Sequence, residues 1–147
     1  MYFQYGDKEI EYLKSKDKKL AEVIDKVGHI DRTVDTDLFS SVVHHIIGQQ
    51  ISTKAQQTIW LRMNEKYGHV TPEVIDSADA AELQALGMTF RKAEYIKDFS
   101  HKVVSGKFSL DAVWHMSDKE AVEALSSLKG GWCMDCRNDT FILYAAA

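Results

Sequence analysis

Residue types able to do chemistry gather at a few places in this 147-residue sequence. Cys133 and Cys136 form a C-x-x-C pair, and His44 and His45 are adjacent. A redox C-x-x-C belongs at the start of a helix after a strand, and a zinc site needs further ligands nearby; neither context is present. Adjacent helical residues diverge by about 100°, so the two histidines do not share one ion easily. We expect no metal and no cofactor.

A polar turn is the remaining candidate. Gln49-Gln50-Ile51-Ser52 follows an apolar stretch that ends at Gly48. Ser52 is expected to cap a helix from Thr53 to Tyr67, because a serine hydroxyl can accept a bond from the first free N–H groups of a helix. On residue types alone, the two glutamines could simply cap and solvate this turn.

The elements that position this turn are predicted to be helices. Apolar residues recur every three or four positions, there is a single Pro, and 45% of residues are hydrophobic and 27% charged. Start signals occur at Thr71-Pro72, at Asp79 with Glu82 and at Ser117 with Glu120, and stop signals at Gly28 and Gly68. No linker or repeat divides the chain, so we predict one all-α bundle of short helices.

Charge and hydropathy limit the classes of function. The net charge is −4, whereas a protein that binds nucleic acid by charge alone is normally basic. Any DNA interface must therefore rest on a local arrangement of groups. No apolar run approaches the ~18 residues of a membrane span, and residues 1–7 lack the pattern of a secretory signal. We expect a cytoplasmic protein that makes no membrane contact.

Three stretches together resemble a known family. They are 42–55, which contains Gly48-Gln49-Gln50-Ile51-Ser52; 86–96, which contains Leu86-Gly87-Met88 and Arg91-Lys92-Ala93; and 125–130, Leu125-Ser126-Ser127-Leu128-Lys129-Gly130. In this order and spacing they resemble the helix-hairpin-helix (HhH-GPD) DNA glycosylases, in particular the DNA-3-methyladenine glycosylase II group. The resemblance covers nearly the whole chain up to Gly130.

The resemblance implies a DNA-binding surface. The turn after Gly48 would face the duplex, with Gln50 or Ile51 as the wedge that fills the gap left by an extruded nucleotide and with Gln49 and Ser52 beside it. The hairpin turn, of which Lys129 and Gly130 are present, would offer backbone N–H groups to a phosphate. Lys54 and Lys92 lie in the matched segments and are further candidates for DNA contacts, although exposed lysines are by default merely solvated.

The family's catalytic part has no counterpart after Gly130. The family continues with Gly-apolar-Gly-apolar-Trp-Thr-Ala-Glu-Met and a catalytic Asp; here Trp132, Asp135 and Asp139 stand in the wrong context. Back-translation from Gly131, read one nucleotide out of phase, can give Val-Gly-Val-Trp-Thr-Ala-Glu-Met. We therefore expect residues 1–130 to be a partial glycosylase domain, without the second hairpin helix and the C-terminal helices, and 131–147 to be an out-of-frame tail. No catalytic residue is assigned.

Two functions follow from these expectations. The first is an alkylbase DNA glycosylase of base excision repair, acting by family on bases such as 3-methyladenine in double-stranded DNA at the bacterial nucleoid, with this chain itself inactive. The second is a non-catalytic helical module that binds DNA or another protein. Loss of the second hairpin helix would leave Val122, Leu125 and Leu128 short of a partner, so a homodimer through that apolar surface is also possible unless the tail covers it.

Overall fold

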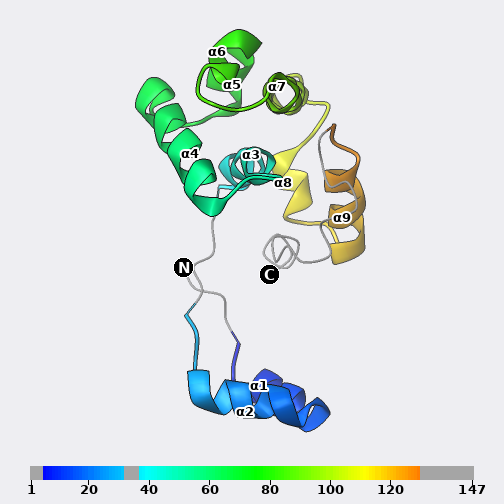
Figure 1. Cartoon of the computed structure of the whole chain (residues 1–147). Helices are drawn as coiled ribbons and strands as arrows, with labels where there is room; N and C mark the ends of the chain where they lie inside the picture. Colours follow the sequence, from blue (N-terminus) through cyan, green and yellow to red (C-terminus); the bar gives the residue numbers. More distant parts are fainter. Residues whose placement is uncertain (1–4, 32–36, 130–147) are drawn as a thin grey trace. The chain divides into compact units, whose positions relative to one another are not determined.

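The computed structural model describes residues 5–31 and 37–129, and every regular element in these ranges is a helix (Figure 1). The chain divides into two compact units, Met1–Thr36 and Asp37–Ala147. The all-α fold predicted from apolar spacing is therefore confirmed, and the two units are described separately. Gly130 and the predicted tail 131–147 lie outside the described residues.

The first unit is a pair of short helices, α1 (Asp7–Lys16) and α2 (Lys18–Val27). Asp17 separates them: its backbone N–H closes the end of α1, and its carboxylate accepts from the N–H groups of Lys19 and Leu20 at the start of α2. Gly28, at φ 74°, ends α2 as predicted. An ion pair between Lys14 of α1 and Asp25 of α2, at 2.8 Å, joins the two helices.

The second unit carries the remaining described helices, and its predicted start signals are confirmed. Thr71 caps the helix that starts with Pro72. Asp79 with Glu82, and Ser117 with Glu120, form the two predicted capping boxes. The short helix α8 was not foreseen, because a single turn is too brief to show a period. The elements are α3 (Leu38–Gly48), α4 (Thr53–Tyr67), α5 (Pro72–Ser77), α6 (Ala80–Gln84), α7 (Phe90–Val104), α8 (Leu110–Val113) and α9 (Asp118–Ser126).

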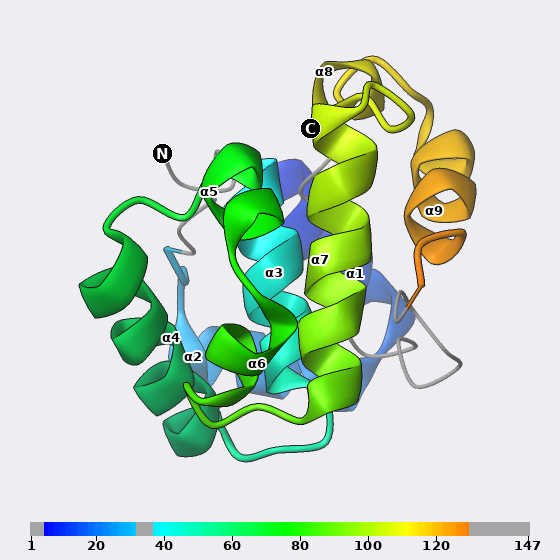
Figure 2. The same cartoon turned by 90° about the horizontal axis from the view of Figure 1, so that it is seen from above.

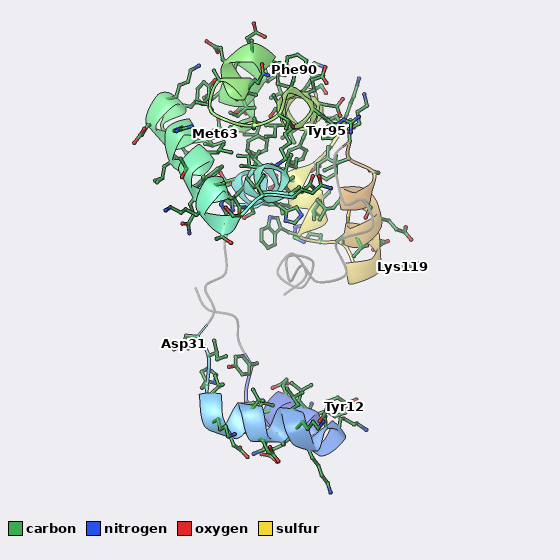
Figure 3. All side chains as sticks on the ribbon, in the orientation of Figure 1. Tyr12, Asp31, Met63, Phe90, Tyr95 and Lys119 are labelled. Atoms are coloured by element: carbon green, nitrogen blue, oxygen red, sulfur yellow. The ribbon has the colours of Figure 1, made fainter. Side chains whose placement is uncertain are left out.

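Helices α3 and α7 form the centre of this unit (Figure 2). Eight of the eleven residues of α3 are buried. Phe39, near the start of α3, stacks on Phe99 of α7 at 5.2 Å between ring centroids, and the end of α3 is bonded to Lys92 in the first turn of α7. The two helices therefore run antiparallel. Met63 of α4 is fully buried in the same core (Figure 3).

The end of α9 corrects one expectation. Leu125 and Leu128 are 1% and 4% exposed and belong to the core cluster, and Val122 is partly buried. They are not short of a partner, so the reason given for a homodimer through this surface does not hold. Within residues 5–31 and 37–129, no helix combines the length and the apolarity needed to cross a bilayer.

The two phenylalanines of α7 provide a test of the core. Phe99 is 1% exposed and Phe90 is 47% exposed. We expect Phe99→Ala to lower the free energy of unfolding by about 3–5 kcal/mol, because it opens a cavity between α3 and α7. Phe90→Ala, the matched control, should change it by less than about 0.5 kcal/mol. Urea unfolding followed by circular dichroism measures both; equal losses would contradict this packing.

Candidate nucleic-acid interface

The turn between α3 and α4 is short and presents Gln50 at its tip. Gln49 has φ −57° and ψ 127°, Gln50 has φ 57°, and the N–H of Ile51 donates to the carbonyl of Gly48 at 3.4 Å. These values match a type II β-turn over residues 48–51, in which the third residue takes a positive φ. Ser52 then starts α4, because its hydroxyl accepts from the N–H of Ala55 at 3.2 Å. This confirms the predicted cap.

Gln50 is the unusual residue of the turn. Among the described residues it alone has a positive φ without being glycine, and its side chain is exposed. The left-handed region is unfavourable for a residue with a Cβ by roughly 1–2 kcal/mol, and glycine or asparagine is the usual choice at this position. Strain of this kind at an exposed polar residue points to a role for the side chain itself.

The turn rests on a close contact between α3 and α4. The side-chain amide of Gln56 donates to the carbonyl of His44 at 2.8 Å and passes directly over Gly48. A Cβ at position 48 would overlap this amide and displace it. The sequence indicated Gly48 only as a stop signal, and the contribution of Gln56 was missed. The sequence offered one signal: Gly48 ends one expected helix, and the polar Gln56 lies near the start of the next.

Lys92 supports the turn from the other side. Its ammonium donates to the carbonyl of Ile47 at 2.7 Å and to that of Gln49 at 2.6 Å. The side chain is half-buried, and this burial lowers the pKa of Lys92 below its usual value. The sequence predicted a DNA-facing lysine; in the structure, two of its three N–H groups point to the protein's own backbone. The prediction of a direct DNA contact stays untested.

The surroundings of the turn are rich in hydrogen-bond donors. Both α4 and α7 begin beside it, because the turn leads into α4 and Lys92 lies in the first turn of α7. Neither helix has an acidic residue in its first turn, so the positive ends of their dipoles are not neutralised there. Lys54 and Arg91 lie in these first turns and are exposed. Predicted residues Gln49 to Lys54 thus lie together.

Lys129, by contrast, lies elsewhere. Its ammonium is 3.7 Å from a carboxylate oxygen of Asp98, which also pairs with Lys102 at 2.9 Å. Asp98 belongs to the middle of α7, whereas the turn lies at the start of that helix. The structure therefore separates Lys129 from the Gln50 turn. Gly130, predicted with it, is outside the described residues.

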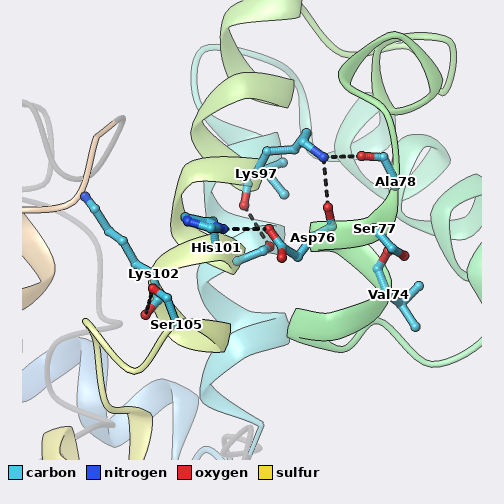
Figure 4. A network of polar contacts seen from close by, with 10 residues as sticks. Val74, Asp76, Ser77, Ala78, Lys97, His101, Lys102 and Ser105 are labelled. Atoms are coloured by element: carbon cyan, nitrogen blue, oxygen red, sulfur yellow. Dashed lines mark hydrogen bonds and ion pairs between the residues drawn. The ribbon is translucent and has the colours of Figure 1, made fainter.

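A second lysine of α7 uses the same chemistry away from the turn (Figure 4). Lys97 donates to the carbonyl of Asp76 at 3.0 Å and to that of Ala78, at the end of α5. His101 lies 3.3 Å from the carboxylate of Asp76. These contacts attach α5 to α7 and touch no residue of the turn, so the cluster is structural.

A model of the "HhH-GPD superfamily base excision DNA repair protein" family matches residues 43–143, more than half of the chain. The chain belongs to the HhH-GPD superfamily. The resemblance seen in the motifs is therefore confirmed, and so is the helical fold that it implied.

Two DNA-3-methyladenine glycosylase relatives by name are similar to this chain. Bacillus subtilis (strain 168) YfjP, whose name carries a provisional assignment as a DNA-3-methyladenine glycosylase, is 25% identical over 119 residues, 76% of this chain and 42% of that protein. The DNA-3-methyladenine glycosidase of Bacillus halodurans is 26% identical with a TM-score of 0.72, over 88% of this chain and 61% of that chain. The chain thus spans less than two thirds of these relatives.

A further solved structure shares the fold. Clostridium acetobutylicum 8-oxoguanine glycosylase/lyase, solved with double-stranded DNA, has a TM-score of 0.76 at 20% identity, over 87% of this chain and 48% of that chain. At this identity the likeness concerns the fold alone. It shows that one helical scaffold occurs in proteins named for different damaged bases.

Replacing Gln50 with glycine tests the strained turn. We expect Gln50→Gly to raise the free energy of unfolding by up to about 1 kcal/mol, because glycine accepts a positive φ without strain. Gln57→Gly, in the exposed middle of α4, is the matched control and should lower stability by about 1 kcal/mol. Both are measured by urea unfolding. A loss at both positions would show that Gln50 is not left-handed in solution.

Proposed function

We propose that this chain binds duplex DNA through the Gln50 turn and opens it at an alkylated base, as the DNA-recognition part of a base excision glycosylase. The observation that carries this proposal is the exposed side chain of Gln50, held at a positive φ on a buttressed turn. Extruding a nucleotide costs a few kcal/mol, and a side chain that fills the vacated space offsets part of that cost. Gln50 is the proposed wedge, and Ile51, 37% exposed beside it, is the neighbouring contact.

The local chemistry supports DNA binding by an acidic chain. The net charge of −4 gives no general attraction to phosphate. Around the turn, however, two helix N-termini lack acidic neighbours, and Lys54 and Arg91 are exposed there. Backbone N–H groups and a few local cations can position a phosphate without a basic surface. The proposed partner is double-stranded DNA in the bacterial cytoplasm, at the nucleoid.

An alkylated base is the proposed lesion. The Bacillus subtilis and Bacillus halodurans relatives both carry 3-methyladenine in their names. An N-alkylated purine is positively charged, so its pair opens more readily and the base leaves more easily. An oxidised purine, as in the Clostridium acetobutylicum structure, is the competing lesion. The affinity of this chain for a duplex with an alkylated base, compared with its affinity for a duplex with an oxidised base, distinguishes the two lesions.

We propose further that the 147-residue chain releases no base. Cleavage of a glycosidic bond builds positive charge on the sugar, and a carboxylate near that charge stabilises it or orients the attacking water. In the family resemblance this Asp follows a Gly-apolar-Gly-apolar-Trp-Thr-Ala-Glu-Met segment, and that segment does not occur in this sequence after Gly130, although the family model extends to residue 143. The second candidate function, a non-catalytic DNA- or protein-binding module, rests on the same turn without the chemistry.

Base release is the direct test of these alternatives. The chain is incubated with a methylated duplex, and free base is measured by chromatography beside an active 3-methyladenine glycosylase as positive control. We expect binding that weakens as salt rises, without base release. Turnover comparable to that of the control would refute the proposed inactivity; no binding at any salt concentration would refute the DNA interface.

Extrusion is tested with a duplex that carries 2-aminopurine beside the lesion, since this base fluoresces more strongly when unstacked. We expect Gln50→Ala to lower the extrusion equilibrium by about tenfold, corresponding to about 1.4 kcal/mol, because the wedge is lost while the turn remains. Gln57→Ala, at an exposed position of α4, is the control and should leave the signal unchanged. Ile51→Ala decides between the neighbouring candidates: a larger effect there would make Ile51 the wedge.

A further inference from the structure

We infer that Lys92 is a positioning residue for nucleotide extrusion: by bonding the carbonyls of Ile47 and Gln49, its ammonium selects the turn conformation that presents Gln50 to DNA. This inference rests on the proposed function of the turn. It assigns to Lys92 a role other than the phosphate contact that its place in the sequence suggested.

The peptide group between Gln49 and Gln50 is the part of the turn that Lys92 contacts. This group contains the carbonyl of Gln49, and its orientation is described by ψ of Gln49 and φ of Gln50. Types I and II of a β-turn differ by rotation of this central peptide through about 180°. In the type II form seen here, the carbonyl of Gln49 points to the ammonium of Lys92 at 2.6 Å. In the type I form it would point away, and this bond would be lost.

Left to itself, the turn would favour the other form. Gln50 pays for a positive φ, whereas in a type I turn the same residue takes an ordinary negative φ. A bond from an ionised donor is stronger than a neutral one, and here it forms only in the strained conformation. The second bond, to the carbonyl of Ile47, anchors the ammonium at the negative end of α3. Lys92 therefore acts as a fixed point against which the peptide is oriented.

Lys97 separates this role from mere attachment of helices. It lies on the same helix, is also partly buried, and donates to backbone carbonyls at the end of α5 (Figure 4). Removing either ammonium takes two hydrogen bonds from a helix end. Of these two lysines, Lys92 bonds a residue of the turn and Lys97 does not. Lys97→Met is therefore a matched control for Lys92→Met.

The first experiment measures amide hydrogen exchange in the full chain without DNA. We expect Lys92→Met to speed exchange over residues 49–52 by about tenfold, because the turn gains access to a second conformation. Lys97→Met should speed exchange near residues 76–79 and leave the turn unchanged. Lys92→Arg, which retains the charge and the donors, should give an intermediate result and covers the case in which the methionine variant fails to fold. Unchanged exchange in the turn of both Lys92 variants would overturn the inference.

The second experiment separates positioning from a phosphate contact. We expect Lys92→Met to lower the 2-aminopurine signal by about tenfold at saturating protein, while the dependence of duplex binding on salt keeps its slope. A lysine that neutralises a phosphate would, when removed, reduce that slope by about one. A reduced slope with unchanged exchange would identify Lys92 as a DNA contact and overturn the inference, as would an unchanged extrusion signal.

The proposed function can fail even if Lys92 holds the turn in its type II conformation. If the wild-type chain binds duplex but gives no extrusion signal, the proposed function is wrong, and a role for Lys92 in extrusion is wrong with it. Amide hydrogen exchange in the turn, measured without DNA, then still decides whether Lys92 holds the type II conformation. If extrusion occurs and Lys97→Met lowers it as much as Lys92→Met does, the effect is general destabilisation and the inference is overturned.

Discussion

The end of α3 is the constraint on which the second unit depends. This helix is largely buried, and its last carbonyls need donors close to the point where the chain turns to the surface. Lys92 supplies them for Ile47 and Gln49, and the amide of Gln56 does so for His44. The antiparallel packing of α3 on α7 follows from the same contacts, together with the stacked Phe39 and Phe99.

The local signals in the sequence predicted most of the helices. Ser52, Thr71 and the Asp79–Glu82 pair act at short range, so their effect can be inferred from a few adjacent residues. The partners of the buried helices could not be predicted in this way, because the stacking of Phe39 on Phe99 depends on how α3 and α7 pack. Burial depends on what packs against an apolar face, and periodicity alone does not supply that information.

The candidate site shows the same limit. The grouping of the predicted residues at one turn is a local property, and their role as DNA contacts stays a prediction; they are Gln49, Gln50, Ile51, Ser52 and Lys54. The partners of Lys92 lie more than forty positions away, so its inward-facing role could not be derived from spacing. Gln56 was missed because its bond to His44 depends on how closely α3 and α4 approach at Gly48. The family resemblance located the region; the contacts come from the packing.

The double attachment of α7 has a mechanical consequence. Lys92 connects its first turn to the end of α3, and Lys97 connects its middle to the end of α5. A load applied at the tip of the Gln50 turn, such as the resistance of stacked bases to being parted, is therefore passed into packed helices instead of bending a loose loop. The resistance of the turn to bending therefore comes from the packed helices that hold it and not from the short loop itself.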